Sequence, residues 1–282
     1  MAEFNKISQS ALNDYLRCPK LFYYRQLLKM KLAKKGLPLV FGSSIHKGLE
    51  EYEDNGEDPI QVFLDDFKYE DVLWVNYQWI PYTEEEAEEI FEAHVENGIR
   101  LLEYFLEERE GKKGKLYNYE VLHTEERFKV KINDQKKKKC LIEDLSGIVD
   151  VVRTDEKLAD YKTSSKKYSQ KMVDESVQPT MYYLWYYLTY GKLPKGFIYI
   201  VFMKKRKKDP IDVLETHRTM ADIVKLISTI NMVKKKVDKG WFNRSHGRKG
   251  FCDCYKYEEM FNSKLEISYD RPKKMVYDLG IA

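Results

Sequence analysis

The spacing of apolar residues along the chain switches between a helical and an alternating period, and this divides the sequence into elements. From Thr83 to about residue 110, apolar side chains recur every three or four positions, as on one face of a long helix. From Phe128 to Ile132 they alternate with lysines, which is typical of a strand with one face in water. Residues 196–203 are apolar throughout, which indicates a buried strand.

The other segments extend this pattern over most of the chain. Helical spacing is expected over residues 8–32, where Pro19 opens a second helix in its first turn. A further helix starts near Gly42–Ser44, after a loop at 34–38. The remaining expected elements are one strand or a pair of short strands at 140–152, strands at 158–163 and 211–216, and helices at 175–190 and 219–238. This order predicts an α/β fold with a central mixed sheet flanked by helices.

Composition narrows the classes of protein that the chain can belong to. Of its 282 residues, 43% are hydrophobic and 34% are charged, which is a soluble, globular composition and not a disordered one. No apolar run reaches the roughly 18–20 residues of a membrane span, and the N-terminus has no secretory signal. Four cysteines are too few for a disulfide scaffold, so we expect a reducing, cytoplasmic setting with no membrane partner.

Two aspartates stand in otherwise apolar strand sequences. Asp150 follows Ile148-Val149 and Asp160 follows Leu158-Ala159, although a carboxylate there is unfavourable unless a partner compensates its charge. A hairpin centred near Asp155 would place the two aspartates opposite each other, with β-carbons about 5 Å apart. Carboxylates that close repel each other unless a cation lies between them, and such oxygen ligands suit Mg²⁺ or Mn²⁺.

Lys162 adds a positive charge to this pair. It lies two residues after Asp160, so both side chains leave the same face of the strand. Beside a metal, a lysine can orient an attacking water and stabilise charge on a phosphate. The structural alternative is that both aspartates are surface charges at hairpin ends, with Lys162 as an ion-pair partner. The apolar surroundings of both aspartates favour the metal site.

These residues form part of a longer ordered set of motifs. Its members are Ser10-Ala11-Leu12, Tyr15, Cys18-Pro19, Phe22 and Tyr24, then Gly42 and His46, then Gly147 and Asp150, then Asp160-Tyr161-Lys162-Thr163-Ser164, and last Gln178 and Tyr182. In this order, with these elements, the set resembles the RecB-like branch of the PD-(D/E)XK nuclease superfamily over residues 8–202. It is similar to CRISPR-associated RecB-like exonucleases and to the nuclease domains of AddAB- and RecBCD-type enzymes.

The resemblance implies a role for each matched residue. The metal ligands would be His46, Asp150, Asp160 and the backbone carbonyl of Tyr161. Lys162 would orient the water nucleophile, so Lys162, Asp150 and Asp160 form the expected catalytic set. Gln178 and Tyr182 lie four residues apart on one helix face, where they would contact the nucleic-acid backbone or the lysine.

Structural alternatives stay open at the flanks of this set. His46 alone could be a structural helix residue, and Gln178 and Tyr182 could be the polar edge of an amphipathic helix. A glutamate of the upstream strand, Glu125 or Glu126, is also expected near the site. Alternation places Glu126 with Phe128, which does not decide between the two.

The cysteines depart from the family pattern. Many RecB-like nucleases hold a [4Fe–4S] cluster with one N-terminal and three C-terminal cysteines, and four thiolates are the usual requirement. Cys18 matches the first position, but only Cys252 and Cys254 follow near the C-terminus. We therefore expect no iron–sulfur cluster. Zinc bound by these three and His246 is the alternative, and buried thiols that touch and pin the C-terminus to the first helices are favoured.

The expected function is a Mg²⁺- or Mn²⁺-dependent DNA nuclease. A RecB-like exonuclease on single-stranded DNA is favoured, acting in recombination, repair or phage DNA metabolism with protein partners of those processes. The alternatives are a structure-specific endonuclease of the same superfamily and a non-catalytic subunit that binds DNA ends. The whole chain, 1–282, is expected to form one nuclease domain with a helical insert at about 50–115 and a C-terminal region at about 219–282.

Two further sequence features bear on DNA contact. The segment 60–83 is expected to be irregular, and its aromatic residues could stack on unpaired bases or pack under the long helix, which is favoured. Basic clusters at 136–139, 204–208, 234–236 and 271–274 are candidates for phosphate contact.

Overall fold

The computed structural model describes residues 5–31, 36–73, 83–134, 139–245 and 252–268 of the chain. The chain forms two compact units. We call the first the sheet unit, which comprises Asn5–Gln9 and Ala33–Thr229. The second is the terminal unit, which comprises Met1–Phe4, Ser10–Leu32 and Ile230–Ala282. The two units are described separately.

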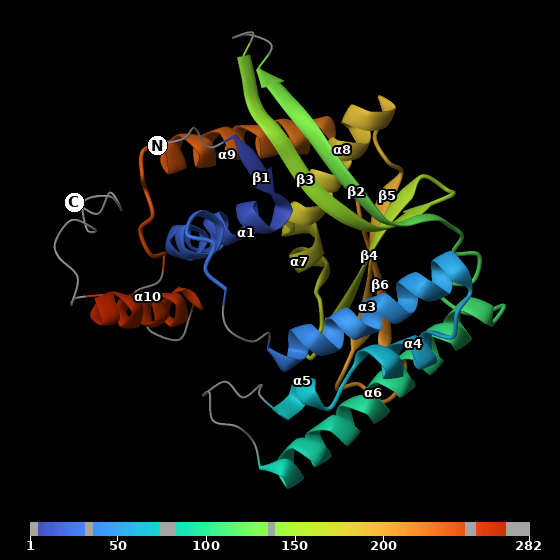
Figure 1. The fold of residues 1–282 in the computed structure, drawn as a ribbon. Helices are drawn as coiled ribbons and strands as arrows, with labels where there is room; N and C mark the ends of the chain where they lie inside the picture. Colours follow the sequence, from blue (N-terminus) through green and yellow to red (C-terminus); the bar gives the residue numbers. More distant parts are fainter. Residues whose placement is uncertain (1–4, 32–35, 74–82, 135–138, 246–251, 269–282) are drawn as a thin grey trace. The chain divides into compact units, whose positions relative to one another are not determined.

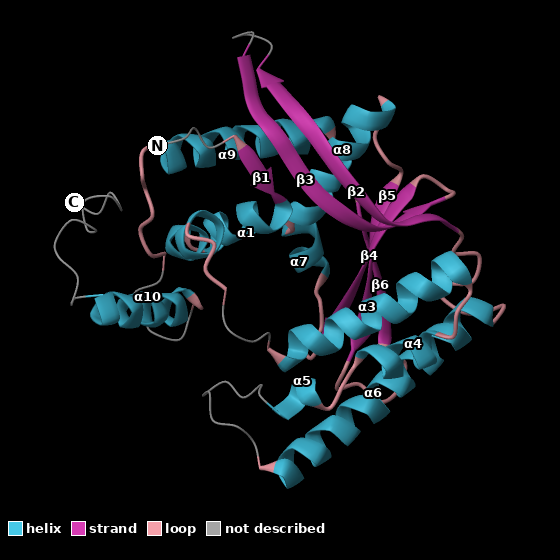
Figure 2. Ribbon diagram, viewed as in Figure 1, coloured by secondary structure: helices cyan, strands magenta, loops and turns pink. Residues whose placement is uncertain are grey.

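A mixed sheet of six strands, counted over the described residues, forms the centre of the sheet unit (Figures 1 and 2). The strands are β1 (Lys6–Ser8), β2 (Val121–Asp134), β3 (Lys139–Arg153), β4 (Lys157–Ser164), β5 (Gly196–Met203) and β6 (Ile211–Thr216). β3 pairs antiparallel with β2 and with β4, and parallel with β1. β5 is parallel to β4 and antiparallel to β6. The predicted α/β fold with a mixed central sheet is confirmed.

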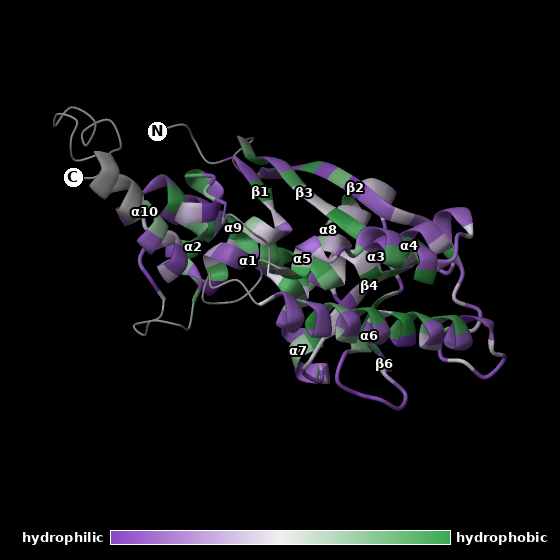
Figure 3. Cartoon of the chain, turned by 60° about the horizontal axis from the view of Figure 1, so that its bottom comes forward, coloured by the Kyte–Doolittle hydropathy of each residue, from purple (hydrophilic) through white to green (hydrophobic). Residues whose placement is uncertain are grey.

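A group of helices packs against the central sheet, and its apolar residues form a shared core with the strands. It consists of α3 (Leu37–Asn55), α4 (Pro59–Asp66), α5 (Glu70–Leu73) and α6 (Glu84–Glu110). α6 starts at a capping box, in which Thr83 and Glu86 satisfy each other's backbone N–H groups. Apolar and polar residues alternate along it with helical spacing (Figure 3), and its buried residues join a core with α3, β4 and β5. The predicted long helix is confirmed.

The aromatic segment after α3 is helical where it is described, and not irregular as expected. The Asp58 side chain caps α4, and Pro59 fits the first turn, where a missing N–H costs nothing. Phe63 and Phe67 are fully buried. A β-carbon on Gly98 of α6 would lie 2.2 Å from the Phe63 ring, so the ring sits directly on that glycine. Packing under the long helix is confirmed for these two rings, whereas Trp74, Tyr77, Trp79 and Tyr82 lie outside the described residues.

A second group of helices, α7 (Gln170–Glu175) and α8 (Val177–Tyr190), follows β4 in the chain. α8 packs aromatic side chains against the sheet. The Trp185 ring stacks on Phe128 of β2 with centroids 5.3 Å apart, and Tyr182 contacts Phe128 and Phe197 of β5. This packing fixes the face of α8 that carries two of the motif residues.

Two features differ from the sequence-based expectation, the start of α3 and the presence of β1, and at β3 the structure decides between two expected alternatives. α3 begins at Leu37, not near Gly42–Ser44, because Pro38 fits the first turn of a helix. β1 was not expected at all, since three residues are too few to show a period. Residues 140–152 belong to one continuous strand, β3.

The terminal unit is helical. It contains most of α1 (Gln9–Arg17), all of α2 (Pro19–Phe22), a short π-helical turn at Tyr23–Leu27, α10 (Cys254–Ser268) and the end of α9 (Met220–Asp238). Pro19 opens α2, as the sequence predicts. The Tyr15 hydroxyl donates to the carbonyl of Trp241 at 2.9 Å, which joins the two ends of this unit. No helix of the described residues is long and apolar enough to cross a membrane.

Candidate active site

The β3–β4 hairpin carries the two aspartates. Its register pairs Val152 with Leu158 and Val151 with Ala159, so the backbone pairing ends one residue before Asp150 and Asp160. Asp150 Oδ2 accepts a hydrogen bond of 2.9 Å from the backbone N–H of Tyr161. The predicted hairpin is present and brings Asp150 next to the strand that carries Asp160, while the predicted spacing of the two β-carbons stays a prediction.

Burial raises the pKa of both carboxyl groups above the ordinary value of an aspartate. Asp160 has no exposed surface. Burial raises the pKa of Asp150 to about 6, and burial together with the charge of Asp150 raises the pKa of Asp160 to about 6. Two buried carboxylates held this close are stabilised when a cation shares them, which is the expected behaviour of metal ligands.

Lys162 supplies one positive charge to this pair. Its ammonium group forms an ion pair with Asp160. Burial alone would lower the pKa of Lys162, but the charges of Asp160 and Asp150 outweigh it and raise the pKa above its ordinary value. Lys162 is therefore protonated at neutral pH and donates hydrogen bonds only.

His46 reaches the same place from α3. Its Nδ1 lies 3.4 Å from Asp150 Oδ2, and burial lowers the pKa of the imidazole, which keeps it neutral and able to bind a metal. Gly42, one turn earlier on the helix, allows this approach. A β-carbon there would lie 2.9 Å from Oγ1 of Thr163 on β4, so a glycine lets the helix come close to the strand.

The structure selects Glu125 over Glu126. Single ligand atoms of His46, Glu125 and Asp150 lie within 4.8 Å of one another, a spacing that could hold a metal ion. Glu125 has a φ of 44°, in the left-handed region that a glutamate rarely adopts. Simple alternation along β2 therefore does not apply at this position, and for that reason the sequence could not decide between the two glutamates.

Gln178 and Tyr182 of α8 lie behind the carboxylates. The Gln178 amide nitrogen donates to Asp160 Oδ1 and, at 2.9 Å, to the Tyr182 hydroxyl. Tyr182 in turn donates to the carbonyl of Ile148 at 2.5 Å. Gln178 thus contacts Asp160 directly, and Tyr182 contacts β3, the strand that carries Asp150. Their expected contact with nucleic acid stays a prediction. The sequence does not single out their neighbour Tyr199, because this residue lies within the continuous apolar run at 196–203.

Tyr161 has two different surroundings. Its backbone hydrogen-bonds both Asp150 and, on the carbonyl side, the His46 ring. Its side chain is buried in the core on the side of α3 and α6, where the hydroxyl donates to Glu53 at 3.4 Å. The backbone is the part that belongs to the site.

The donor set fits a hard divalent cation. Carboxylate and carbonyl oxygens are the ligands that Mg²⁺ and Mn²⁺ prefer, and one imidazole shifts the preference somewhat toward Mn²⁺. Of the expected donors, those on α3, β2 and β3 converge on one place in the sheet unit, whereas Asp160 of β4 does not belong to this group. His46, Glu125 and Asp150 are the residues whose ligand atoms lie closest together there.

The three cysteines meet in the terminal unit. Sulfur atoms of Cys18, Cys252 and Cys254 lie within 4.8 Å of one another, and all three residues are buried. The predicted contact is confirmed. Cys140 lies apart and donates to the carbonyl of Ile132. Three sulfur donors do not satisfy a [4Fe–4S] cluster, and His246 lies outside the described residues.

Three residues of the basic clusters have partners within the protein, among the residues that the structure describes. Arg206 forms two hydrogen bonds to Asp212, and Lys234 pairs with Asp238. Lys204 lies over the Phe41 ring, and burial lowers its pKa. Residues 136–138 and 271–274 are not among the described residues.

Comparisons with known proteins agree with this geometry. The family model described as the PD-(D/E)XK nuclease superfamily matches residues 6–257. A crystal structure from Eubacterium rectale, described as a "putative exonuclease", superposes with a TM-score of 0.54 at 13% identity, covering 90% of this chain and 88% of that one. This likeness shows the fold.

A second solved structure, SSO0001, has a TM-score of only 0.32 at 14% identity, over 83% of this chain and 78% of that one, and adds nothing further. No curated protein matches the chain. The family match covers most of the chain and includes the hairpin with Asp150, Asp160 and Lys162. The chain therefore belongs to the PD-(D/E)XK nuclease superfamily, and its fold is that of a hydrolytic nuclease.

Proposed function

We propose that the protein is a Mg²⁺- or Mn²⁺-dependent DNA nuclease, and that it acts as an exonuclease on single-stranded DNA. The observation that supports this proposal best is the fully buried Asp160 with the partly buried Asp150 near it, Lys162 ion-paired to Asp160 and His46 beside Asp150. A surface ion pair needs no such burial, whereas a nuclease site gains from it because charge acts strongly where water is excluded.

Each residue has a role in this proposal. His46, Asp150, Asp160 and the Tyr161 carbonyl would hold the ion, and Glu125 is placed to join them. When bound, such an ion supplies Lewis-acid stabilisation of the phosphate. The Lys162 ammonium orients the attacking water and stabilises the negative charge that develops on the phosphate oxygens. Its raised pKa keeps it positively charged throughout.

The exonuclease form rests on weaker support than the nuclease chemistry. It agrees with the description of the Eubacterium rectale protein, whose likeness to this chain lies in the fold. In our proposal the helical segment at about 50–115 guides a strand end toward the hairpin. Recombination, repair or phage DNA metabolism would supply such ends.

End-labelled DNA tests the proposal. Linear and circular single strands, and linear duplexes, are incubated with Mg²⁺, with Mn²⁺ or with EDTA. We expect the linear single strand to be degraded, the circle to resist, and all cleavage to stop in EDTA. Full cleavage after exhaustive chelation would overturn the metal-dependent mechanism, and rapid cutting of the circle would favour a structure-specific endonuclease.

A further inference from the structure

A chain of hydrogen bonds links Asp160 to three residues of the sheet unit, Gln178, Tyr199 and Ser176. The amide nitrogen of Gln178 donates to Asp160, and the Gln178 Oε1 accepts from the Tyr199 hydroxyl at 3.3 Å. The Tyr199 oxygen is also 3.0 Å from Ser176 Oγ. Tyr199 is 2% exposed, whereas Ser176 and Gln178 are half-buried.

Donor and acceptor roles fix the direction of this chain. The Asp160 carboxylate can only accept, so it needs the NH₂ end of the Gln178 amide. The Tyr182 hydroxyl uses its own proton on the Ile148 carbonyl, so it also accepts from that NH₂ group. Burial raises the pKa of Tyr199, which keeps the phenol protonated and able to donate to the oxygen end. The amide therefore has one favourable orientation.

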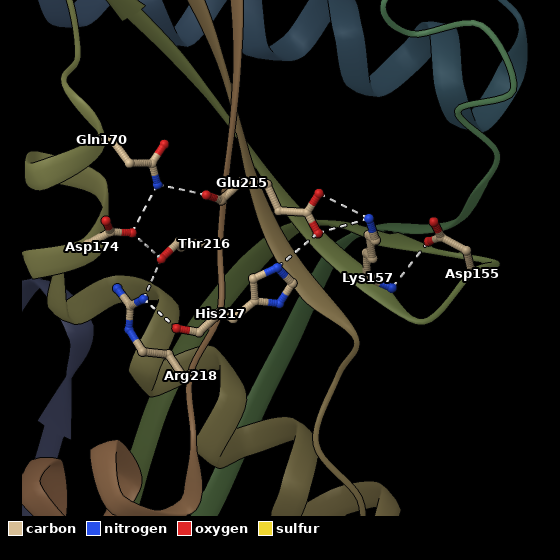
Figure 4. Close-up of polar contacts among 8 residues, drawn as sticks. All are labelled: Asp155, Lys157, Gln170, Asp174, Glu215, Thr216, His217 and Arg218. Atoms are coloured by element: carbon tan, nitrogen blue, oxygen red, sulfur yellow. Dashed lines mark hydrogen bonds and ion pairs between the residues drawn. The ribbon is translucent and has the colours of Figure 1, made fainter.

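The backbone around Gln178 is held by a separate anchor. The guanidinium of Arg218, which follows β6, donates to the carbonyls of Val173 and Ser176 at 3.0 and 3.1 Å and to Thr180 Oγ1 at 2.9 Å. Figure 4 shows Arg218 bonded to Thr216, which in turn bonds Asp174 of α7. Arg218 thus fixes where α8 begins, and it does so through groups other than the Gln178 amide.

Tyr199 is the residue that holds the oxygen end of the Gln178 amide. The register of β4 and β5 pairs Asp160 directly with Tyr199, so the phenol starts beside the carboxylate and reaches the amide that holds it. Without the hydroxyl, the oxygen end of the amide loses its donor, so the amide that holds Asp160 is fixed at its NH₂ end only. Loss of the hydroxyl would therefore disturb the position of Asp160 and not the fold, because the ring at position 199 still packs against Phe197.

We propose that Tyr199 is a positioning residue of the nuclease site, whose hydroxyl orients the Gln178 amide and through it holds Asp160 ready to bind the metal. This inference rests on the proposed function, because it assumes that Asp160 is a metal ligand. It extends the site by one residue that touches neither metal nor substrate.

The central test is Tyr199→Phe, which removes only the hydroxyl. One neutral hydrogen bond corresponds to about a three- to tenfold change in an equilibrium constant. We expect Mn²⁺ affinity, measured by calorimetry, and cleavage at subsaturating Mn²⁺ to fall by about that factor. Binding of single-stranded DNA in EDTA should stay as in wild type. Tyr186→Phe, a buried tyrosine whose ring packs on Tyr190 of the same helix, is the matched control and should change neither quantity.

A double-mutant cycle separates positioning from a general structural effect. In a Gln178→Leu background there is no amide to orient, so adding Tyr199→Phe should change Mn²⁺ affinity by less than about twofold. An equal loss in both backgrounds, or wild-type affinity in Tyr199→Phe, would overturn the proposal. A wild-type protein that binds Mn²⁺ but does not cleave DNA would overturn the proposed function alone, because the calorimetric cycle still decides the role of Tyr199. A wild-type protein that binds no Mn²⁺ would overturn both.

Discussion

At the scale of single residues, the site combines one fully buried carboxylate with partly buried charged neighbours. Asp160 is fully buried and its neighbour Lys162 balances part of its charge. Asp150 keeps a backbone hydrogen bond from Tyr161 but still has a raised pKa, because burial outweighs that bond. Each aspartate therefore weakens the metal-free fold while it prepares a site for a cation, which is a common compromise at functional sites.

The first prediction concerns the roles of Asp160 and Lys162. Asp160→Ala removes a proposed ligand, so Mn²⁺ affinity and turnover should both be lost. Lys162→Ala removes a group that acts mainly on the water and the transition state, so we expect about a 10²–10³-fold lower single-turnover rate with Mn²⁺ and DNA binding nearly unchanged. Calorimetry and single-turnover cleavage decide it. If Lys162→Ala cleaves within a few-fold of wild type, Lys162 is only an ion-pair partner.

The second prediction uses the pKa of Asp150, which burial raises to about 6 from an ordinary value of 3.8. Between these values the folded state keeps the proton that the unfolded state loses, so the metal-free protein becomes less stable as the pH rises through about 6. The Asp150→Asn variant has no carboxyl group to ionise at this position, so it does not lose stability in this way as the pH rises. We expect it to be more stable than wild type by roughly 1–3 kcal/mol at pH 8 in EDTA, with little difference at pH 4. Urea unfolding at the two pH values tests it, and a less stable variant at pH 8 would contradict the assignment.

At the scale of elements, one glycine lets a helix deliver its histidine to a strand. Gly42 and His46 lie one turn apart on α3, and the helix approaches β4 so closely that Thr163 would contact any β-carbon at position 42. On α6, Gly98 makes the same kind of space for the Phe63 ring of α4. Helix placement in the sheet unit thus depends on positions without a side chain.

The third prediction is that Gly42→Ala harms activity more than stability. The added methyl group meets Thr163 Oγ1 at 2.9 Å, so α3 or the threonine must shift, and small displacements of a catalytic group can cost about tenfold or more in rate. Thr163→Ala in the same chain should restore part of the rate. Gly36→Ala is the control, because its nearest neighbour would be Pro38 Cδ at an ordinary 3.8 Å. Equal cleavage rates for Gly42→Ala and Gly36→Ala would show that this close approach is unimportant.

At the scale of the whole molecule, the chain divides its chemistry between two units. All proposed ligands of the divalent ion belong to the sheet unit, whereas Cys18, Cys252 and Cys254 belong to the terminal unit. In the terminal unit, the thiols are surrounded by Leu21, Tyr24 and Tyr257, which form a small apolar core. Such surroundings suit thiols that act as small hydrophobic groups.

The fourth prediction follows from that packing. Protein purified without oxygen should show no visible absorption from an iron–sulfur cluster and no stoichiometric zinc by elemental analysis. Cys252→Ala should lower the free energy of unfolding by about 1–2 kcal/mol, because a buried side chain is shortened, while Mn²⁺-dependent cleavage persists. Stoichiometric iron or zinc that is lost in Cys252→Ala would show that the cysteines bind metal.

Features that depend on neighbours in the chain can be predicted from the sequence. Periodicity located the main helices and strands, and a short hairpin brings the segment of Asp150 beside that of Asp160, because the register of a hairpin follows from its turn. The order of the motifs also indicated the superfamily. Boundaries such as the start of α3 were missed, because a proline in a first helical turn looks like a loop.

Only the tertiary structure decided the features that join distant elements. Glu125 faces the site because its backbone leaves the regular strand geometry, which alternation cannot show. Gln178 contacts Asp160 and Tyr199 because α8 packs against the sheet at one particular angle and height. The convergence of possible ligands from α3, β2 and β3 likewise depends on packing between segments far apart in the chain, and packing free energies are not encoded in any local pattern.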